Sequence, residues 1–208
     1  MFAGGDASPP GVVADLPADA LVVAADSGAV HAVGEGRAID ILVGDFDSIP
    51  AALLAELEEG GVDVRRHPVD KDRTDLALAL DAAVEAGATD LTVVGGHGGR
   101  LDHLLANALL LAAEEYAPYR MEARCGPARL TVLRGRRALH GHPGELVSLL
   151  PVGGPAGGVT TEGLDYPLHD AELRPGVTWG VSNRFSGPSA TVTVDRGVLL
   201  AVQPGPER

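Results

Sequence analysis

Residues 21–48 read LVVAADSGAVHAVGEGRAIDILVGDFDS and contain two apolar runs, each followed at once by a polar motif. The runs, residues 21–25 and 41–43, are short and rich in Val, Ile and Leu, which is typical of buried strands in a parallel sheet. This stretch therefore predicts two neighbouring strands with polar side chains placed where each strand ends.

The same pattern continues along the first half of the chain. Further strand-like runs lie at residues 62–64 and 91–94. Helical patterns lie at residues 51–59, 74–83 and 101–115. Alternation of strands and helices predicts βαβ units, so we expect residues 1–125 to form an α/β domain built on a parallel sheet.

The second half has a different texture. Gly and Pro interrupt short alternating stretches at residues 145–150, 190–194 and 198–202, and we expect a loop at residues 151–158. These features predict a smaller all-β domain over residues 126–208.

Composition limits the classes of function. The formal net charge of −13 argues against nucleic acid as a partner, because phosphate backbones are bound chiefly by surplus Lys and Arg. The longest apolar stretch, residues 104–113, is too short to span a bilayer, so we expect no membrane segment. The single cysteine, Cys125, cannot form an internal disulfide, and no secretion signal is visible, so we expect a cytoplasmic protein.

Polar motifs follow all four predicted strands. They are DSGAVH at residues 26–31, GDFDS at 44–48, DKDRTD at 70–75 and GGHGGRLDH at 95–103. Because the carboxyl ends of parallel strands share one edge of the sheet, where ligands bind in open α/β folds, we expect these motifs to converge.

The motif GDFDS is a candidate magnesium site. In an extended stretch Asp45 and Asp47 point the same way while Phe46 points into the core, and paired carboxylates suit a hard cation. The alternative is that the pair only caps a helix beginning near Pro50. In DKDRTD, helix capping alone would explain Asp75, whereas the like charges of Asp70 and Asp72 predict that at least one binds metal.

The glycine-rich segment 95–99 lies between a strand and a helix, where backbone amides can approach an anion. It is not a Walker A loop, because no Gly-Lys-Ser/Thr follows. Arg100 is placed to bind phosphate oxygens, and Asp102 could orient its guanidinium. His-x-x-His or similar spacing is absent from the sequence, so we do not expect zinc.

The segments ADSGAVH, GDFDS, DKDRTDLALAL and GGRLDHLLAN, in this order, resemble the thiamine pyrophosphokinase family, and GLDYPL (163–168) and GVSN (180–183) resemble its C-terminal domain. The resemblance implies a Rossmann-like catalytic domain followed by a β-sandwich, a homodimer, and Mg²⁺-dependent transfer of pyrophosphate from ATP to thiamine. The thiamine would lie between subunits, near the nucleotide.

The resemblance also implies roles for individual residues. The metal ligands would be Asp45, Asp47, Asp72 and Asp75, and the catalytic residues Asp47, Asp72, Arg100 and Asp102. The nucleotide would contact Asp26, Ser27, Gly28, His31, Gly98, Gly99, Arg100 and His103. Thiamine would contact Tyr166, Ser182 and Asn183, with Tyr166 stacking on its ring.

Three features depart from the family pattern. Val30 stands where Asn is common, Arg184 stands where an acidic residue is usual, and the strand expected before Gly4 is nearly absent. Three other functions stay open: a related pyrophosphokinase acting on another alcohol such as a pterin, a phosphohydrolase using the same carboxylates, and a thiamine or nucleotide sensor that binds without turnover.

Overall fold

The structure is a computed structural model that describes residues 1–70 and 72–205. The chain divides into two compact units: Met1–Asn107 with Ala123–Gly126, and Ala108–Glu122 with Pro127–Arg208. Helix α4 (Leu101–Leu111) and strand β5 (Arg120–Cys125) contribute residues to both units. Each unit is described by itself below.

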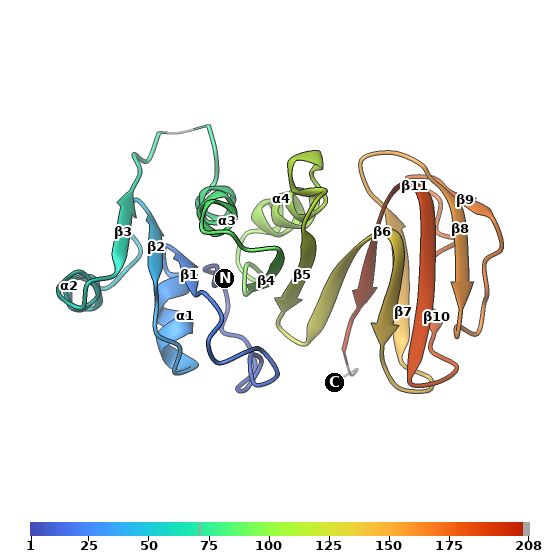
Figure 1. Cartoon of the computed structure of the whole chain (residues 1–208), viewed down its shortest axis with the longest axis horizontal. Coiled ribbons are helices and arrows are strands. Elements are labelled where there is room, and N and C mark those ends of the chain that lie inside the picture. Colours follow the sequence, from blue (N-terminus) through green and yellow to red (C-terminus); the bar gives the residue numbers. More distant parts are fainter. Residues whose placement is uncertain (71, 206–208) are drawn as a thin grey trace. The chain divides into compact units, whose positions relative to one another are not determined.

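The first unit is built on parallel strands (Figure 1). They are β1 (Val23–Ala25), β2 (Ile41–Gly44), β3 (Asp63–Arg66) and β4 (Asp90–Val94). Strands β1 and β2 pair in parallel, as do β2 and β3. All four strands lie within a few residues of their predicted positions.

Phe2 joins β1 to β4 through a parallel bridge on each side. Its amide donates to the Val23 carbonyl (2.8 Å), and its carbonyl accepts from the Ala25 amide (2.8 Å). On the other side, the Ala3 amide donates to Val94 (2.9 Å). The strand that the family pattern places before Gly4 is thus represented here by a single bridging residue, Phe2.

Helices connect the strands of the first unit. Their bounds are α1 (Gly28–Gly34), α2 (Ala51–Glu59), α3 (Asp75–Glu85) and α4. Helix α3 packs on β1 and β2 and buries residues such as Leu76 and Leu80, as its spacing predicted. Helix α1 was not predicted, because seven residues rich in Gly and Val carry little helical signal. Helix α4 ends at Leu111, earlier than predicted, because the backbone is extended at Ala113, before a 3₁₀ turn (Glu114–Tyr116).

The second unit consists mainly of antiparallel strands. Besides residues of β5, these are β6 (Ala128–His140), β7 (Leu146–Pro151), β8 (Ala156–Glu162), β9 (Ala171–Leu173), β10 (Asn183–Arg184) and β11 (Ser189–Gln203). The loop expected at residues 151–158 is therefore shorter than predicted, because β8 begins at Ala156.

Strand β11 organises this unit. It pairs with β6 along most of its length, with β8 through Thr191–Thr193 and Arg196, and with β7 through Leu199–Val202. An irregularity between Val194 and Leu199 separates the two halves, which the sequence suggested were two strands. One bent strand thus serves two partners on the side opposite β6, and the core between the layers includes Leu149, Val159, Phe185 and Leu199.

The predicted fold class is confirmed: a parallel α/β unit is followed by a larger region of mixed and antiparallel sheet. Among the described residues, none of the helices has the length and apolar composition needed to cross a membrane.

The first unit depends on Gly28, because a Cβ atom there would lie 2.3 Å from the carbonyl oxygen of Phe2. We expect Gly28→Ala to lower the free energy of unfolding by about 1–3 kcal/mol through overpacking. Gly34 lies in the same helix with no atom within 4 Å of its Cβ position, so Gly34→Ala is the matched control and should stabilise by up to about 1 kcal/mol. Urea unfolding of both variants measures the difference, and equal stability would contradict the role given to Phe2.

Candidate active site

A cleft of about 320 Å³ lies at the carboxyl edge of the parallel sheet, within the first unit. Its lining is Ala3, Gly4, Gly5, Ala25, Asp26, Ser27, Ser48, Thr74, Asp75, Leu76, Gly96, His97, Gly98, Gly99, Arg100, His103 and Asn107. These residues include members of all four polar motifs, so the predicted convergence of the motifs is confirmed.

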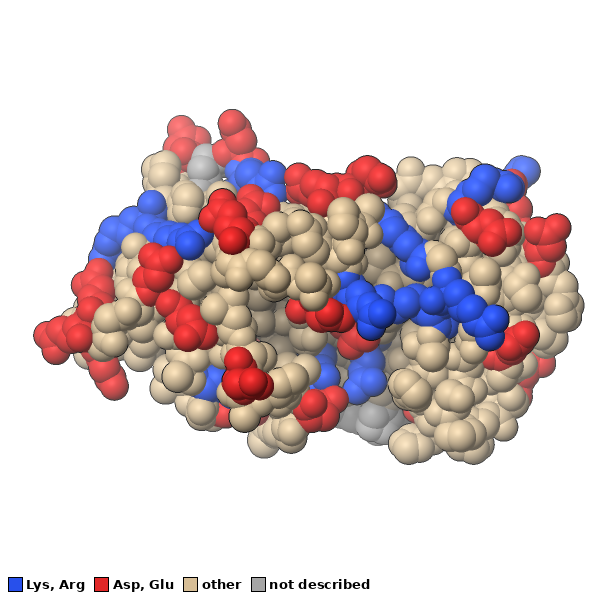
Figure 2. Space-filling model, in the orientation of Figure 1, with Lys and Arg blue, Asp and Glu red and all other residues tan. Residues whose placement is uncertain are grey.

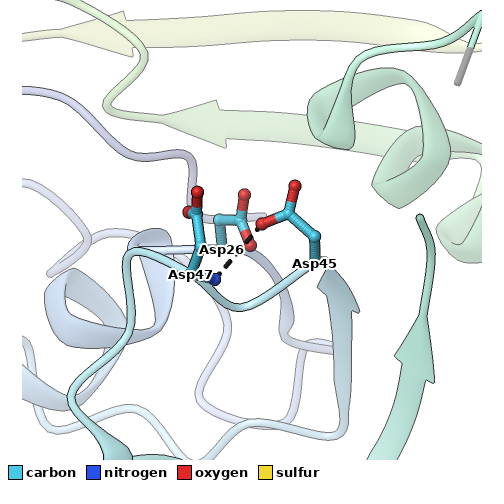
Figure 3. A group of neighbouring side chains, drawn as sticks. All are labelled: Asp26, Asp45 and Asp47. Carbon is cyan, nitrogen blue, oxygen red and sulfur yellow. Dashed lines mark hydrogen bonds between the residues drawn. The ribbon is translucent and has the colours of Figure 1, made fainter. Parts of the chain in front are cut away.

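Three carboxylates gather at this edge. One oxygen each of Asp26, Asp45 and Asp47 lies within 4.8 Å of the other two. Figure 3 shows the three side chains pointing to the same side from the ends of β1 and β2. Asp26 and Asp45 are partly buried and Asp47 is exposed, so the group faces solvent on one side.

The backbone of GDFDS is turned rather than extended. Phe46 has a left-handed φ of 68°, and the Asp47 amide donates to Asp45 Oδ1 (3.2 Å). The two carboxylates therefore meet through a tight turn, and the extended geometry expected from the sequence was wrong. Phe46 is buried as predicted, at 6% exposure, and the guanidinium of Arg66 lies 4.9 Å from its ring centroid.

Asp26 is the most constrained carboxylate of the group. Its Oδ1 accepts from the Phe46 amide (3.0 Å), and it lies so close to Gly44 that a Cβ atom there would be 2.2 Å from this oxygen. Burial, together with the charges of Asp75 and Asp45, raises the pKa of Asp26 to about 6, although the hydrogen bond from the Phe46 amide opposes the shift. Asp26 thus lies inside the acidic group as well as beside the predicted nucleotide site.

The motif DKDRTD contributes Thr74 and Asp75 to the cleft. The Thr74 hydroxyl caps helix α3 by accepting from the Ala77 amide (3.3 Å). Asp75 begins the helix and lies near enough to Asp26 to raise the pKa of Asp26. Asp72 is exposed and does not belong to the three-carboxylate group found among the described residues. Lys71 lies outside the described residues.

The glycine-rich loop is tied to the start of the chain. The Gly96 amide donates to the Gly4 carbonyl (2.8 Å), and the Asp6 amide donates to the His97 carbonyl (2.8 Å). Gly98 and Gly99 are exposed and line the cleft, as expected of residues that would face an anion.

Arg100 and Asp102 form a two-pronged ion pair. Arg100 Nη2 lies 2.6 Å from Asp102 Oδ2, and Nε lies 3.2 Å from Oδ1. The hydrogen bonds from Arg100 hold the pKa of Asp102 at about 2, so the carboxylate is charged throughout the physiological range. The pair is exposed, at 71% and 64%, which leaves the guanidinium accessible to a ligand in the cleft.

The other predicted nucleotide contacts have mixed placements. Ser27 and His103 line the cleft, whereas Gly28 is buried and His31 Nε2 lies 3.1 Å from the Gly5 carbonyl. Neither Gly28 nor His31 is among the lining residues.

The predicted thiamine contacts lie in the second unit. Tyr166 is 65% exposed, Ser182 is exposed with a left-handed φ of 59°, and Asn183 is buried. Asn183 makes hydrogen bonds to both backbone polar groups of Tyr166.

Sequence reasoning missed several residues. Ser48 and Asn107 line the cleft, and Asn107 Nδ2 lies 3.4 Å from the Gly96 carbonyl. The signal for Asn107 was its place as a polar residue inside an apolar helical run. Trp179, the only tryptophan of the sequence, is 62% exposed, and its sequence neighbours gave no sign of this.

Two family models match the chain. Residues 16–121 match the thiamin pyrophosphokinase catalytic domain, and residues 136–199 match the thiamin pyrophosphokinase vitamin B1 binding domain. The matches follow one another along the chain and together cover most of it.

Individual relatives point to the same family as the two family models. The chain is 28% identical over 193 residues to the thiamine pyrophosphokinase of Bacillus subtilis, covering 88% of this chain and 86% of that protein. The crystal structure of the Bacillus subtilis thiamine pyrophosphokinase superposes with a TM-score of 0.86 at 25% identity, over 99% of this chain and 97% of that one. The thiamin pyrophosphokinase of Geobacillus thermodenitrificans gives a TM-score of 0.83 at 31% identity, over 99% and 96%.

The raised pKa of Asp26 predicts a pH-dependent stability. Because the pKa of Asp26 in the folded protein, about 6, exceeds the ordinary carboxyl value of 3.8, its contribution to stability is fully present below about pH 4 and is lost as pH rises through about 6. Asp26→Asn keeps an oxygen for the Phe46 amide and tolerates the left-handed φ of 46°. In EDTA at pH 7.5 we expect this variant to be more stable than the wild type by about 1–2 kcal/mol, after discounting for partial exposure.

Urea unfolding at pH 7.5 and pH 4 measures this difference, which should disappear at the lower pH. Asp47→Asn, at the exposed member of the group, should change stability less. Equal stabilities of wild type and Asp26→Asn at pH 7.5 would contradict the proposed crowding of the carboxylates.

Proposed function

Because this chain belongs to the thiamin pyrophosphokinase family, we propose that it transfers the terminal pyrophosphate group of ATP to the hydroxyl of thiamine, giving thiamine diphosphate and AMP. The observation that carries this proposal is the cleft of the first unit, where carboxylates, a glycine-rich loop and Arg100 lie together. That combination suits the phosphates of a nucleotide bound with a divalent cation.

The proposed cation is Mg²⁺, held by Asp26, Asp45 and Asp47 with Asp75 close by. The donor set fits: all ligands would be hard carboxylate oxygens, and one oxygen of each lies within 4.8 Å of the other two, so small side-chain rotations would bring them to one ion. Bound there, Mg²⁺ would neutralise phosphate charge. Asp72, predicted as a further ligand, stays a prediction.

The residues of the chain mainly position the reactants and balance charge. Arg100 would bind phosphate oxygens through its guanidinium, and Asp102 holds that guanidinium in one orientation. Gly98 and Gly99 would let backbone amides approach the phosphates. In the transfer, the thiamine oxygen bonds to the β-phosphorus as the bond to the α,β-bridging oxygen breaks, AMP leaves, and the hydroxyl proton is released.

The proposed thiamine contacts are Tyr166 and Ser182 in the second unit. Thiamine carries a permanent positive charge, which the face of an exposed tyrosine ring attracts, and the acidic chain favours a cationic ligand. In this proposal residues 1–125 provide the nucleotide and metal site, and residues 126–208 contribute to thiamine binding and dimerisation. We also propose a cytoplasmic location, which cell fractionation would test.

A related pyrophosphokinase or a sensor would use the same cleft differently. A pyrophosphokinase acting on a pterin would release AMP with a pterin alcohol rather than with thiamine. A sensor would bind thiamine or nucleotide without releasing AMP. The match of residues 136–199 to the vitamin B1 binding domain favours thiamine over a pterin, and the match of residues 16–121 to the catalytic domain favours turnover over sensing.

The decisive assay measures AMP release from ATP and Mg²⁺ with and without thiamine, and identifies the thiamine product by mass. We expect thiamine-dependent AMP together with thiamine diphosphate. Release of ADP or phosphate without thiamine would indicate a hydrolase, and thiamine binding without any release would indicate a sensor.

Asp47→Asn is the control variant in this assay, because Asp47 is exposed and its loss should leave the fold intact. We expect its turnover to fall at least about a hundredfold, since one ligand of the proposed cation is lost. Circular dichroism would verify folding, and turnover at the wild-type rate would refute the metal assignment.

The proposed homodimer predicts twice the chain mass of 21.2 kDa in solution. Sedimentation equilibrium of the full chain at micromolar concentration measures this mass. A single species at the monomer mass would contradict the dimer while leaving the proposed reaction to be judged by the AMP assay.

A further inference from the structure

Tyr166 is an exposed aromatic on a firmly held loop between β8 and β9. Leu164 and Leu168 on either side are buried, at 5% and 4% exposure, while Tyr166 itself is 65% exposed. The Leu168 amide donates to the Thr161 hydroxyl (2.8 Å), and the Thr161 amide donates to the Leu168 carbonyl (3.0 Å). The loop is therefore fixed on both sides of an outward-facing ring.

Asn183 fixes the backbone of Tyr166 itself. Its Oδ1 accepts from the Tyr166 amide (3.1 Å) and from the Arg184 amide (2.8 Å), and its Nδ2 donates to the Tyr166 carbonyl (2.7 Å). The residue is 6% exposed. Both the oxygen and the nitrogen of the carboxamide thus bond within the chain, and little of the side chain reaches the surface.

A primary amide suits this contact, because its oxygen accepts and its NH₂ group donates. Only a side chain that both accepts and donates can bond the N–H and the C=O of the same residue. An aspartate would keep the acceptor but place a buried negative charge against the Tyr166 carbonyl, and an alanine would leave the Tyr166 amide and carbonyl without this partner. Pro167 adds a further restriction, because a residue before proline is confined to extended conformations.

We propose that Asn183 is a positioning residue, which does not touch thiamine but fixes the backbone of Tyr166 so that its ring is presented for stacking. This inference rests on the proposed function and changes the role that the family resemblance implied for Asn183 from direct contact to support. A preorganised ring loses less conformational entropy when the ligand binds. Asn183 should therefore increase the affinity of the protein for thiamine.

The test compares Asn183→Ala with the wild type through kcat and the KM values for thiamine and ATP. We expect the KM for thiamine to rise about tenfold, with the KM for ATP and kcat changing less than about twofold. Asn183→Asp, which keeps only the acceptors, should show the same selective rise.

Gln203→Ala is the matched control. Gln203 is a second buried amide of the same unit, at 5% exposure, and its Nε2 donates to the His140 carbonyl (2.9 Å) and to Glu145 Oε1 (2.8 Å). We expect both Gln203→Ala and Asn183→Ala to lower the melting temperature, but only Asn183→Ala to change the KM for thiamine. An equal KM increase in Gln203→Ala would show general destabilisation and overturn the proposal.

A double-mutant cycle with Tyr166→Ala separates positioning from direct contact. If Asn183 acts through Tyr166, the effect of Asn183→Ala on the KM for thiamine should disappear in the Tyr166→Ala background. Persistence of the full effect in that background would mean direct contact, and an unchanged KM in Asn183→Ala alone would mean no role. A wild-type protein without thiamine-dependent AMP release would instead refute the proposed function itself.

Discussion

Crowding of negative charge at one edge of the parallel sheet is the constraint on which the candidate site depends. Asp26, Asp45 and Asp47 lie together, and Asp75 is near enough to raise the pKa of Asp26, in a protein that already carries a formal charge of −13. Such an arrangement opposes folding, and burial of Asp26 together with the charges of Asp75 and Asp45 raises the pKa of Asp26. Figure 2 shows acidic side chains spread over much of the visible face, so general solubility does not require this particular cluster. A bound cation would reverse the sign of the local field and make the same edge attractive to phosphates.

The backbone around these carboxylates is held in conformations that ordinary residues avoid. The described part of the chain has four non-glycine residues with positive φ, and three of them, Asp26, Phe46 and Ser182, belong to motifs that the sequence singled out. Strain of this kind persists only where surrounding structure enforces it, and it concentrates at ligand sites. At Phe46 the enforcing contacts are burial of the ring and the bond from its amide to Asp26.

The sequence predicted the strands of the first unit because each is an apolar run with a polar motif after it, and parallel topology then brought the motifs together. It did not predict α1, because Gly28–Gly34 lacks helical signals, or the continuity of β11, because Asp195–Gly197 resembles a turn. The proximity of Asp45 and Asp47 was predicted from an extended backbone, which is wrong. The sequence pattern alone does not reveal that Phe46 has a left-handed φ. The buried position of Asn183 depends on tertiary packing between distant segments, which no local pattern encodes.

The ligands proposed for the two units carry opposite charges, and each unit offers different groups to bind its ligand. In the first, the proposed ligand is a polyanion, and the chain offers carboxylates for a cation, backbone amides at glycines and the exposed guanidinium of Arg100. In the second, the proposed ligand is an organic cation, and the chain offers an aromatic face on a loop fixed by buried leucines and Asn183. Within the part of the chain that the structure describes, we identify no single dominant catalytic group, and this agrees with a transfer in which the protein contributes mainly position and charge balance. The accuracy of that positioning then depends as much on supporting residues such as Gly44, Asp102 and Asn183 as on the groups that would meet the ligands.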